Sequence, residues 1–193
     1  MDLREVSEFL QRHPEKPVSP AKLEYTFYMF PEGEQNALEK IAETAQRDEN
    51  EMKTKEEIES TEDPSELLRM MRRQYSRFNM AALRRHVLKH EKEMYPLIQK
   101  RCITNGMDIF TENALNFFLN CEENPAEWIY AEYPNFRNEY LKSMFCLVLG
   151  ARGTVEMIPF LMKETERFEK LYYDESFEQG PILAIQKLSL EYL

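Results

Sequence analysis

Glycine is scarce in this chain, which has 5 glycines among 193 residues. An average globular protein uses glycine at about 7% of its positions. Tight hairpins and phosphate-binding loops depend on glycine, because it adopts backbone conformations that other residues avoid. The shortage therefore argues against an all-β fold and against an α/β nucleotide-binding fold. Leucine, glutamate, lysine, arginine and 11 methionines are abundant instead, and this composition is typical of helical proteins.

Long apolar runs are also missing. The longest run, at residues 144–149, is far shorter than the stretch of about 20 residues that a membrane-spanning helix needs. The amino terminus starts with the acidic residue Asp2, and no apolar stretch of signal-peptide length follows it. We therefore expect a cytoplasmic protein with no membrane partner.

Cysteine is limited to three widely spaced residues, Cys102, Cys121 and Cys146. An odd number of cysteines in apolar segments does not indicate a disulfide framework. We expect reduced, buried thiols that react slowly. A cysteine nucleophile needs a partly exposed, electropositive setting with a base in reach, and the neighbours of Cys146 in the sequence offer neither.

Apolar residues are frequent enough for a folded core, because 42% of the chain is hydrophobic and 12% is aromatic. A folded protein of this size removes about 70% of the unfolded chain's surface from water. The composition changes along the chain, and the helical pattern becomes regular only from Pro64 onward. We therefore expect an N-terminal arm over residues 1–63 and a helical domain over residues 64–193.

The arm is predicted to begin with a short amphipathic helix, at roughly residues 3–11. A connector follows, in which three prolines within residues 14–20 prevent the helix from continuing. The segment of residues 23–30 is too short for its hydrophobic period to distinguish a helix from an extended segment. We favour a helix. Residues 48–63 contain eight acidic residues and two lysines, so we expect a solvated helix or a mobile linker there.

Residues 67–78 have the period of an amphipathic helix. At 100° per residue, one face carries Leu67, Met71, Tyr75 and Phe78. The opposite face carries the arginines Arg69, Arg72, Arg73 and Arg77. The pattern predicts one helix with a core face and an arginine face.

Further helices are expected after this one, separated by short connections. They span roughly residues 81–90, 94–103, 108–121, 126–132, 138–149, 155–172 and 176–193. Residues 138–149 are apolar nearly all round, which is typical of a helix that is covered on both sides. We expect this helix at the centre of a stack.

A short pattern repeats within the helical domain. Residues 93–100 match residues 156–163, with Glu, Met, Pro and Lys identical at an offset of 63. A third copy of the pattern, at residues 127–129, lies between these two in the sequence. An apolar helix precedes each copy. A period of about 30 residues built from helix pairs is the mark of an α-solenoid, in which neighbouring pairs stack. The sequence therefore predicts an all-α fold, with an N-terminal arm and a short right-handed α-solenoid.

Residues 149–161, which read Leu-Gly-Ala-Arg-Gly-Thr-Val-Glu-Met-Ile-Pro-Phe-Leu, resemble a turn and second-helix start of HEAT-like repeats. The similarity is to the short variety of these repeats named for phycobilin lyases. In such a turn Gly150 and Gly153 allow a left-handed helix stop, and Thr154 caps the next helix. Pro159 then fixes the direction in which that helix starts. The resemblance implies a binding scaffold more often than an enzyme.

Two histidines, His86 and His90, lie one helical turn apart. This spacing suits a metal, which Glu93 or Cys102 could help to bind. The zinc-hydrolase motif is incomplete, because Val87 occupies the position of its glutamate. Since this spacing is common on helices by chance, we expect two surface histidines, no metal and no cofactor.

The acidic residues of the helical domain do not sort into a catalytic pair. They fall in polar stretches at residues 122–123, 164–166 and 174–175, where nothing would raise a carboxyl pKa toward neutrality. We expect these stretches to be solvated faces of helices. No catalytic residue is predicted.

Charge is distributed unevenly along the chain. The net charge of −10 consists of −9 over residues 1–63, +7 over residues 64–101 and −8 over residues 102–193. The overall sign disfavours general affinity for nucleic acid or anionic membranes. Guanidinium groups suit phosphate and carboxylate, because they form two parallel hydrogen bonds with them. The positive block predicts a basic patch of Arg69, Arg72, Arg73, Arg77, Arg84, Arg85 and Lys89.

Two interpretations of the basic patch are equally open. It could pair with acidic residues of the same chain, above all those of residues 48–63, or it could bind an external anionic partner. We further hypothesise that residues 48–63 fold back and mask the patch. Because exposed ion pairs are weak, this masking should be partial and sensitive to salt.

A second candidate surface is aromatic and consists of Trp128, Tyr130 and Tyr133. Aromatic residues are enriched at protein interfaces. Simple core packing is the competing interpretation, and for Trp128 we favour it.

These observations favour a protein–protein interaction scaffold or adaptor without catalytic activity. The alternative is binding of nucleic acid or another polyanion through the basic helices at residues 69–101. A more distant alternative is an enzyme or a ligand chaperone of the lyase type, because a fold by itself does not determine function.

Overall fold

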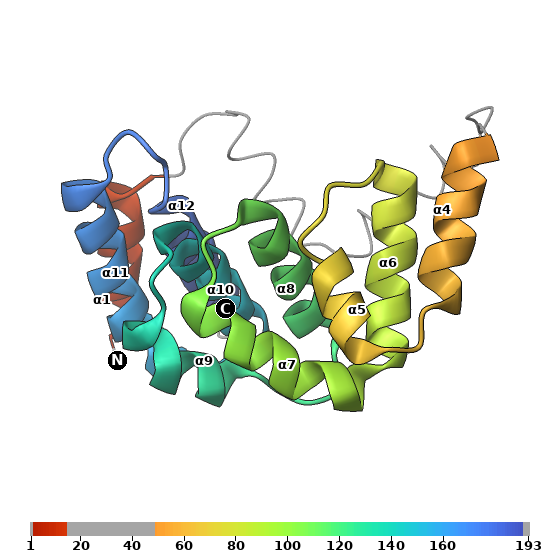
Figure 1. The fold of residues 1–193 in the computed structure, drawn as a ribbon. Coiled ribbons are helices and arrows are strands. Elements are labelled where there is room, and N and C mark those ends of the chain that lie inside the picture. The colour runs from red at the N-terminus through yellow and green to blue at the C-terminus, as the bar shows by residue number, and fades with distance from the viewer. Residues whose placement is uncertain (1, 15–48, 191–193) are drawn as a thin grey trace. The chain divides into compact units, whose positions relative to one another are not determined.

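The computed structural model describes residues 2–14 and 49–190 (Figure 1). Every regular element in these two ranges is a helix. The predicted all-α class is therefore confirmed for the described part of the chain. The helix expected at residues 23–30 and most of the proline-rich connector lie outside the described residues. Among the described helices, none combines the length and the apolar character that crossing a membrane requires.

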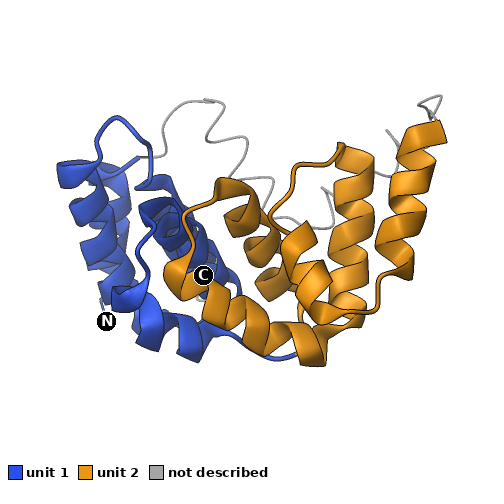
Figure 2. Cartoon of the chain, in the orientation of Figure 1, with its two compact units in different colours: residues 1–29, 123–193 blue, residues 30–122 orange. Residues whose placement is uncertain are grey.

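The chain forms two compact units (Figure 2). One comprises residues 1–29 and 123–193, and the other comprises residues 30–122. This grouping differs from the predicted division between residues 63 and 64, because it places the acidic stretch and the first part of the helical domain in the same unit.

The unit of residues 30–122 is built around the helix α6 (Arg77–Lys89), which contacts α4 (Glu49–Ser60) and three other helices. The acidic helix α4 packs along α6, and Ile58 is the residue of α4 that is buried. The acidic stretch is thus a mostly exposed helix that is anchored by one apolar side chain. The helices of this unit are α4 (Glu49–Ser60), α5 (Pro64–Met70), α6 (Arg77–Lys89), α7 (Glu91–Thr104) and α8 (Asp108–Asn120).

The single helix predicted over residues 67–78 is wrong, because two helices and a turn occupy this stretch. The helix α5 ends at Met70, and α6 begins at Arg77. Ser76 is the N-cap of α6, and its hydroxyl oxygen accepts a hydrogen bond from the backbone N–H of Asn79 at 3.3 Å. A serine that caps a new helix in this way competes with continuation of the old one. Leu67 and Met71 are buried as expected, because the core face is preserved on both sides of the break.

The other unit contains α1 (Leu3–Arg12), α9 (Ala126–Glu132), α10 (Glu139–Arg152), α11 (Ile158–Leu171) and α12 (Gln179–Leu190). There are also two short 3-10 segments. One, Tyr133–Asn135, extends α9, and the other, Val155–Met157, directly precedes α11. The helix α12 packs against α10, α11 and α1. Residues 143–150 of α10 are all buried, so the expectation of a covered helix at this position is confirmed.

The glycine turn expected after α10 is not formed as predicted. The helix α10 continues through Gly150 to Arg152, and Gly153 has an extended backbone with φ −88° rather than a left-handed one. Thr154 occupies the N-cap position of the next 3-10 segment without a capping hydrogen bond from its side chain. Pro159 does lie in the first turn of α11, as expected. Gly150 serves another purpose, which is the close approach of α10 to Ala184 of α12.

The three cysteines are free and buried. Burial raises the pKa of the Cys102 thiol well above its usual value, and it raises that of Cys146 to about 12. Their predicted burial and lack of disulfides are confirmed.

Candidate functional site

The turn between α5 and α6, together with the first residue of α6, presents three of the predicted basic residues to solvent. Arg72, Arg73 and Arg77 are all exposed. None of these three side chains forms a hydrogen bond or an ion pair with another residue in the part of the chain that the structure describes. We call these three residues the arginine turn.

Arg69 differs from the arginine turn, because it is already paired. Its Nε and Nη2 atoms donate to the two carboxylate oxygens of Glu66 at 2.7 and 2.6 Å. The hydrogen bond from Arg69, together with the charges of Arg69 and Arg73, lowers the pKa of the Glu66 carboxyl. Glu66 thus forms its hydrogen bonds with Arg69, and among the described residues it forms none with the arginine turn.

The remaining members of the basic patch lie on α6, and they do not share one role. Arg84 is half-buried, and its Nε atom donates to Oδ1 of Asn113 on α8 at 3.0 Å. Asn113 in turn donates to the carbonyl oxygen of Met71 at 3.0 Å. Arg84 therefore takes part in joining α6 to α8 and to the end of α5. Arg85 is half-buried, and Lys89 is exposed.

The acidic helix α4 has ion pairs of its own. Glu49 pairs with Lys53 at 3.0 Å, and Glu59 pairs with Lys55 at 3.7 Å. Glu57 influences the basic patch through its charge, which contributes to a raised pKa of Arg69. The hydrogen bond with Glu66 is the largest cause of that rise. Masking of the arginine turn by residues 48–63 stays a prediction.

The three aromatic residues of the second candidate surface lie at different depths. Tyr130 is 47% exposed and packs edge-on against Phe160, with ring centroids 5.1 Å apart. Trp128 is half-buried and has ring contacts with Phe136 and Phe145. Tyr133 is only 4% exposed. These residues therefore contribute mainly to the core of their unit, and Tyr130 is the one that solvent reaches freely.

Tyr133 belongs to a polar network that was not expected from the sequence. Its hydroxyl donates to Oε2 of Glu164 at 2.9 Å and lies 3.5 Å from Sγ of Cys146. Arg167 joins Glu164 to Glu139, since its Nη2 atom lies 2.6 Å from a carboxylate oxygen of Glu139. The spacing of Glu164 and Arg167 in the sequence indicates a pair on one helix face, but it gives no sign of Tyr133.

Burial decides the chemistry of this network. It raises the pKa of the Tyr133 hydroxyl well above its usual value, as it raises that of the Cys146 thiol. Both groups keep their protons at neutral pH, and a protonated thiol is a poor nucleophile. The network therefore stabilises the contact between α10 and α11 rather than activating a reagent.

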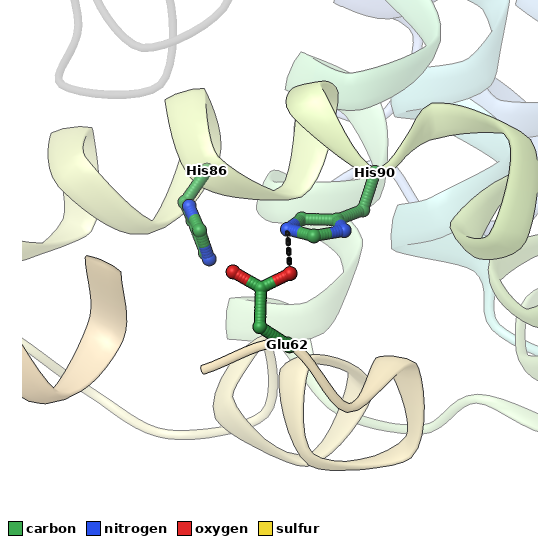
Figure 3. A group of neighbouring side chains, drawn as sticks. All are labelled: Glu62, His86 and His90. Carbon is green, nitrogen blue, oxygen red and sulfur yellow. Dashed lines mark ion pairs between the residues drawn. The ribbon is translucent and has the colours of Figure 1, made fainter. Parts of the chain in front are cut away.

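The two histidines of α6 lie in a setting that the sequence did not suggest. His86 is only 5% exposed, so its predicted place on the surface is wrong. The ring of His90 packs edge-on against it, with centroids 4.8 Å apart. The third member of the group is Glu62 rather than Glu93 or Cys102, and one carboxylate oxygen lies 3.8 Å from Nε2 of His90 (Figure 3). This carboxylate comes from the segment between α4 and α5, so spacing within α6 could not reveal it.

No family model matches the chain, and neither a curated protein nor a solved structure does. What these side chains can bind therefore follows from their own chemistry.

Proposed function

We propose that this chain is a non-catalytic protein-interaction module that binds an acidic segment of a protein partner through the arginine turn. The observation that carries this proposal is the unpaired state of Arg72, Arg73 and Arg77 in the described part of the chain. Nearby basic residues with local partners, such as Arg69 and Arg84, show that pairing within the unit is available. Arg72, Arg73 and Arg77 are three exposed guanidinium groups within six residues of the chain, and each can form two parallel hydrogen bonds with a carboxylate.

The charge of the rest of the chain favours a short acidic segment over a long polyanion. The arginine turn lies in a block with a net charge of +7, but the flanking residues 1–63 and 102–193 carry −9 and −8. A long nucleic acid would meet this negative charge beyond the patch, whereas a short peptide needs only the patch itself.

A repeat of HEAT-like helix pairs, arranged as a short right-handed α-solenoid, is part of the proposal. Burial at matched positions of α7 and α11 supports it. Three pairs of residues at the offset of 63 are buried in both copies: Tyr95 and Ile158, Ile98 and Leu161, and Cys102 and Thr165. The two copies lie on α7 and α11, which follow α6 and α10 in the order of the chain. Such repeats commonly serve as binding surfaces.

A binding experiment with two probes tests the proposed function. The full chain is titrated into a labelled ten-residue peptide of glutamate and aspartate, and separately into single-stranded RNA of ten nucleotides. We expect the peptide to bind. The triple variant Arg72→Gln, Arg73→Gln, Arg77→Gln should weaken this binding roughly tenfold, since each exposed charge contact is worth about 0.2–1 kcal/mol. Arg137→Gln, which changes an exposed arginine outside the patch, is the matched control and should leave the affinity unchanged.

Nucleic-acid binding is the second candidate function, and the +7 block is the observation in its favour. It predicts that RNA binds more tightly than the peptide and that its affinity falls steeply with salt. The expected log–log slope is about −0.7 for each phosphate contacted on a single strand. Tighter binding of RNA than of the peptide, with this slope, would contradict the proposed protein partner and favour a nucleic acid as the partner. Equal peptide affinity in the triple variant and the parent would contradict a role of the arginine turn.

A further inference from the structure

We propose that Glu62, His86 and His90 form a binding site for a divalent transition-metal ion, and that Zn²⁺ is the ion that fits it. One ligand atom from each residue lies within 4.8 Å of the other two. Figure 3 shows the imidazole rings of His86, in α6, and of His90, the C-cap residue after α6, on the side of the Glu62 carboxylate. This site is separate from the arginine turn, and its test does not depend on the proposed function.

The fold brings the three ligands together from two elements. His86 lies in the last turn of α6, and His90 is the C-cap residue directly after the helix, four residues further along the chain. Their rings are in edge-on contact, so both face the same space. Glu62 lies between the end of α4 at Ser60 and the start of α5 at Pro64. Since α4 packs along α6, the segment that follows α4 is held beside the histidines.

Only small movements separate this arrangement from a coordinated ion. Zinc bonds to histidine nitrogen and carboxylate oxygen are about 2.0–2.2 Å long, so neighbouring ligands of a tetrahedral ion lie about 3.3 Å apart. Glu62 and His90 are at 3.8 Å, close to that separation. The Glu62 side chain is 78% exposed, so it can turn toward an ion without disturbing the core. Water can then fill the fourth position from the solvent side.

His86 needs one change before it can coordinate. A carbonyl oxygen only accepts hydrogen bonds, so Nε2 of His86 is the donor in its 2.8 Å contact with the carbonyl oxygen of Thr61. Its Nδ1 atom is buried, and it has no hydrogen-bond partner among the described residues. When Nε2 binds an ion, the proton moves to Nδ1 without creating a buried charge. Because Nδ1–H then lacks an acceptor, the site should bind more weakly than a closed structural zinc site.

The ligand types decide which ion fits. Two imidazoles and one carboxylate suit zinc and its neighbours, whereas Mg²⁺ and Ca²⁺ prefer ligand sets made entirely of oxygen. The buried thiols Cys102, Cys121 and Cys146 do not compete for the ion in the folded protein. A bound ion would tie the segment between α4 and α5 to α6, so its role is to hold the acidic helix in place.

Calorimetric titration of the full chain with Zn²⁺ alone, after removal of metals with a chelator, tests the site. We expect one equivalent to bind at pH 7.5. His90→Gln and Glu62→Gln should each weaken binding at least about tenfold, because changes to outer partners alone commonly cost 10- to 100-fold. The controls are His13→Gln, which changes a histidine of the other unit, and Glu59→Gln, which changes an exposed acid of α4. Both controls should bind Zn²⁺ like the parent.

A thermal readout completes the test. Zn²⁺ should raise the Tm of the parent and of both controls in a concentration-dependent way, and Mg²⁺ should not. The rise should shrink at pH 5.5, where protons compete for the imidazole nitrogens. The proposal is overturned if Zn²⁺ binding does not saturate. It is also overturned if His90→Gln and Glu62→Gln bind Zn²⁺ as tightly as the parent.

Discussion

Gly150 of α10 lies directly against Ala184 of α12. A Cβ atom added to Gly150 would be 2.5 Å from the Cα atom of Ala184 and 2.7 Å from its Cβ atom. Gly180 makes a second close approach between the same helices, because a Cβ atom there would collide with the carbonyl oxygen of Ser143. The two helices therefore pack backbone to backbone, and glycine is required at both crossings.

Gly150→Ala should destabilise the protein even though alanine is the better helix former. Relief of the collision requires α10 and α12 to move apart, and overpacking of this kind typically costs about 1–3 kcal/mol. We expect a lower midpoint of urea unfolding. Gly106→Ala is the matched control, because a Cβ atom at Gly106 has no other atom within 4 Å. That variant should match the parent or be slightly more stable. A Gly150→Ala midpoint at or above that of the parent would show that the helices can separate at no cost.

The buried thiols should make the protein less stable in alkali. In the unfolded chain a thiol titrates near about 8.5, whereas Cys146 in the folded protein has a pKa of about 12 and that of Cys102 is also raised. The unfolded chain therefore loses these protons first as the pH rises. The contribution of these thiols to the free energy of unfolding should be constant between about pH 7 and 8 and fall above that, by up to about 1.4 kcal/mol per pH unit for each thiol. Urea titrations between pH 7 and 10.5 measure this slope.

Cys146→Ala provides the comparison for that slope. The variant should be less stable at neutral pH, because it leaves a small cavity, but its stability should fall less steeply between pH 8.5 and 10.5. A slope as steep as that of the parent would mean that Cys146 is not the group whose titration is linked to folding.

Thiol reagents should react slowly with the native protein. All three cysteines are buried, and the raised pKa values of Cys102 and Cys146 keep these thiols protonated. We expect labelling by a disulfide-exchange reagent to be slow in buffer and fast in denaturant, with three thiols counted at the end. Fast labelling of Cys146 without denaturant would contradict its position in α10.

Local patterns predicted much of the fold. The helix at residues 3–11, the covered helix at residues 138–149 and the proline in the first turn of α11 all follow from apolar period and capping chemistry. The break in the helix between Met70 and Arg77 was not predicted. A helical wheel over residues 67–78 assumes one continuous helix and takes no account of the N-cap at Ser76.

Contacts between distant residues were beyond such patterns. Glu62 lies more than twenty residues before His86, and the two meet only because α4 packs along α6. The role of Gly150 was misjudged for the same reason, since its partner Ala184 lies on another helix. The residue type suggested that the helix stops at Gly150. In the structure, the lack of a side chain at Gly150 instead allows α12 to approach α10 closely.

Neutralising α4 should strengthen binding of the acidic peptide if residues 48–63 mask the arginine turn. Deleting residues 1–63 is a poor test, because α4 packs along α6 and Ile58 is buried. Glu56→Gln combined with Glu57→Gln removes two exposed charges and keeps the helix. We expect peptide affinity at low salt to rise about two- to fivefold, as loss of a weak competing interaction allows. Glu127→Gln, an exposed acid of α9, should give no rise.

Salt separates masking from a general effect of charge. Masking acts over short distances between exposed groups, so the gain from the double variant should vanish at about 0.5 M salt, where charges are screened within a few Å. A gain that is equal in the double variant and in Glu127→Gln would mean that only the net charge matters. Unchanged affinity in the double variant at low salt would show that α4 leaves the arginine turn open, and the three arginines would then be permanently available to a partner.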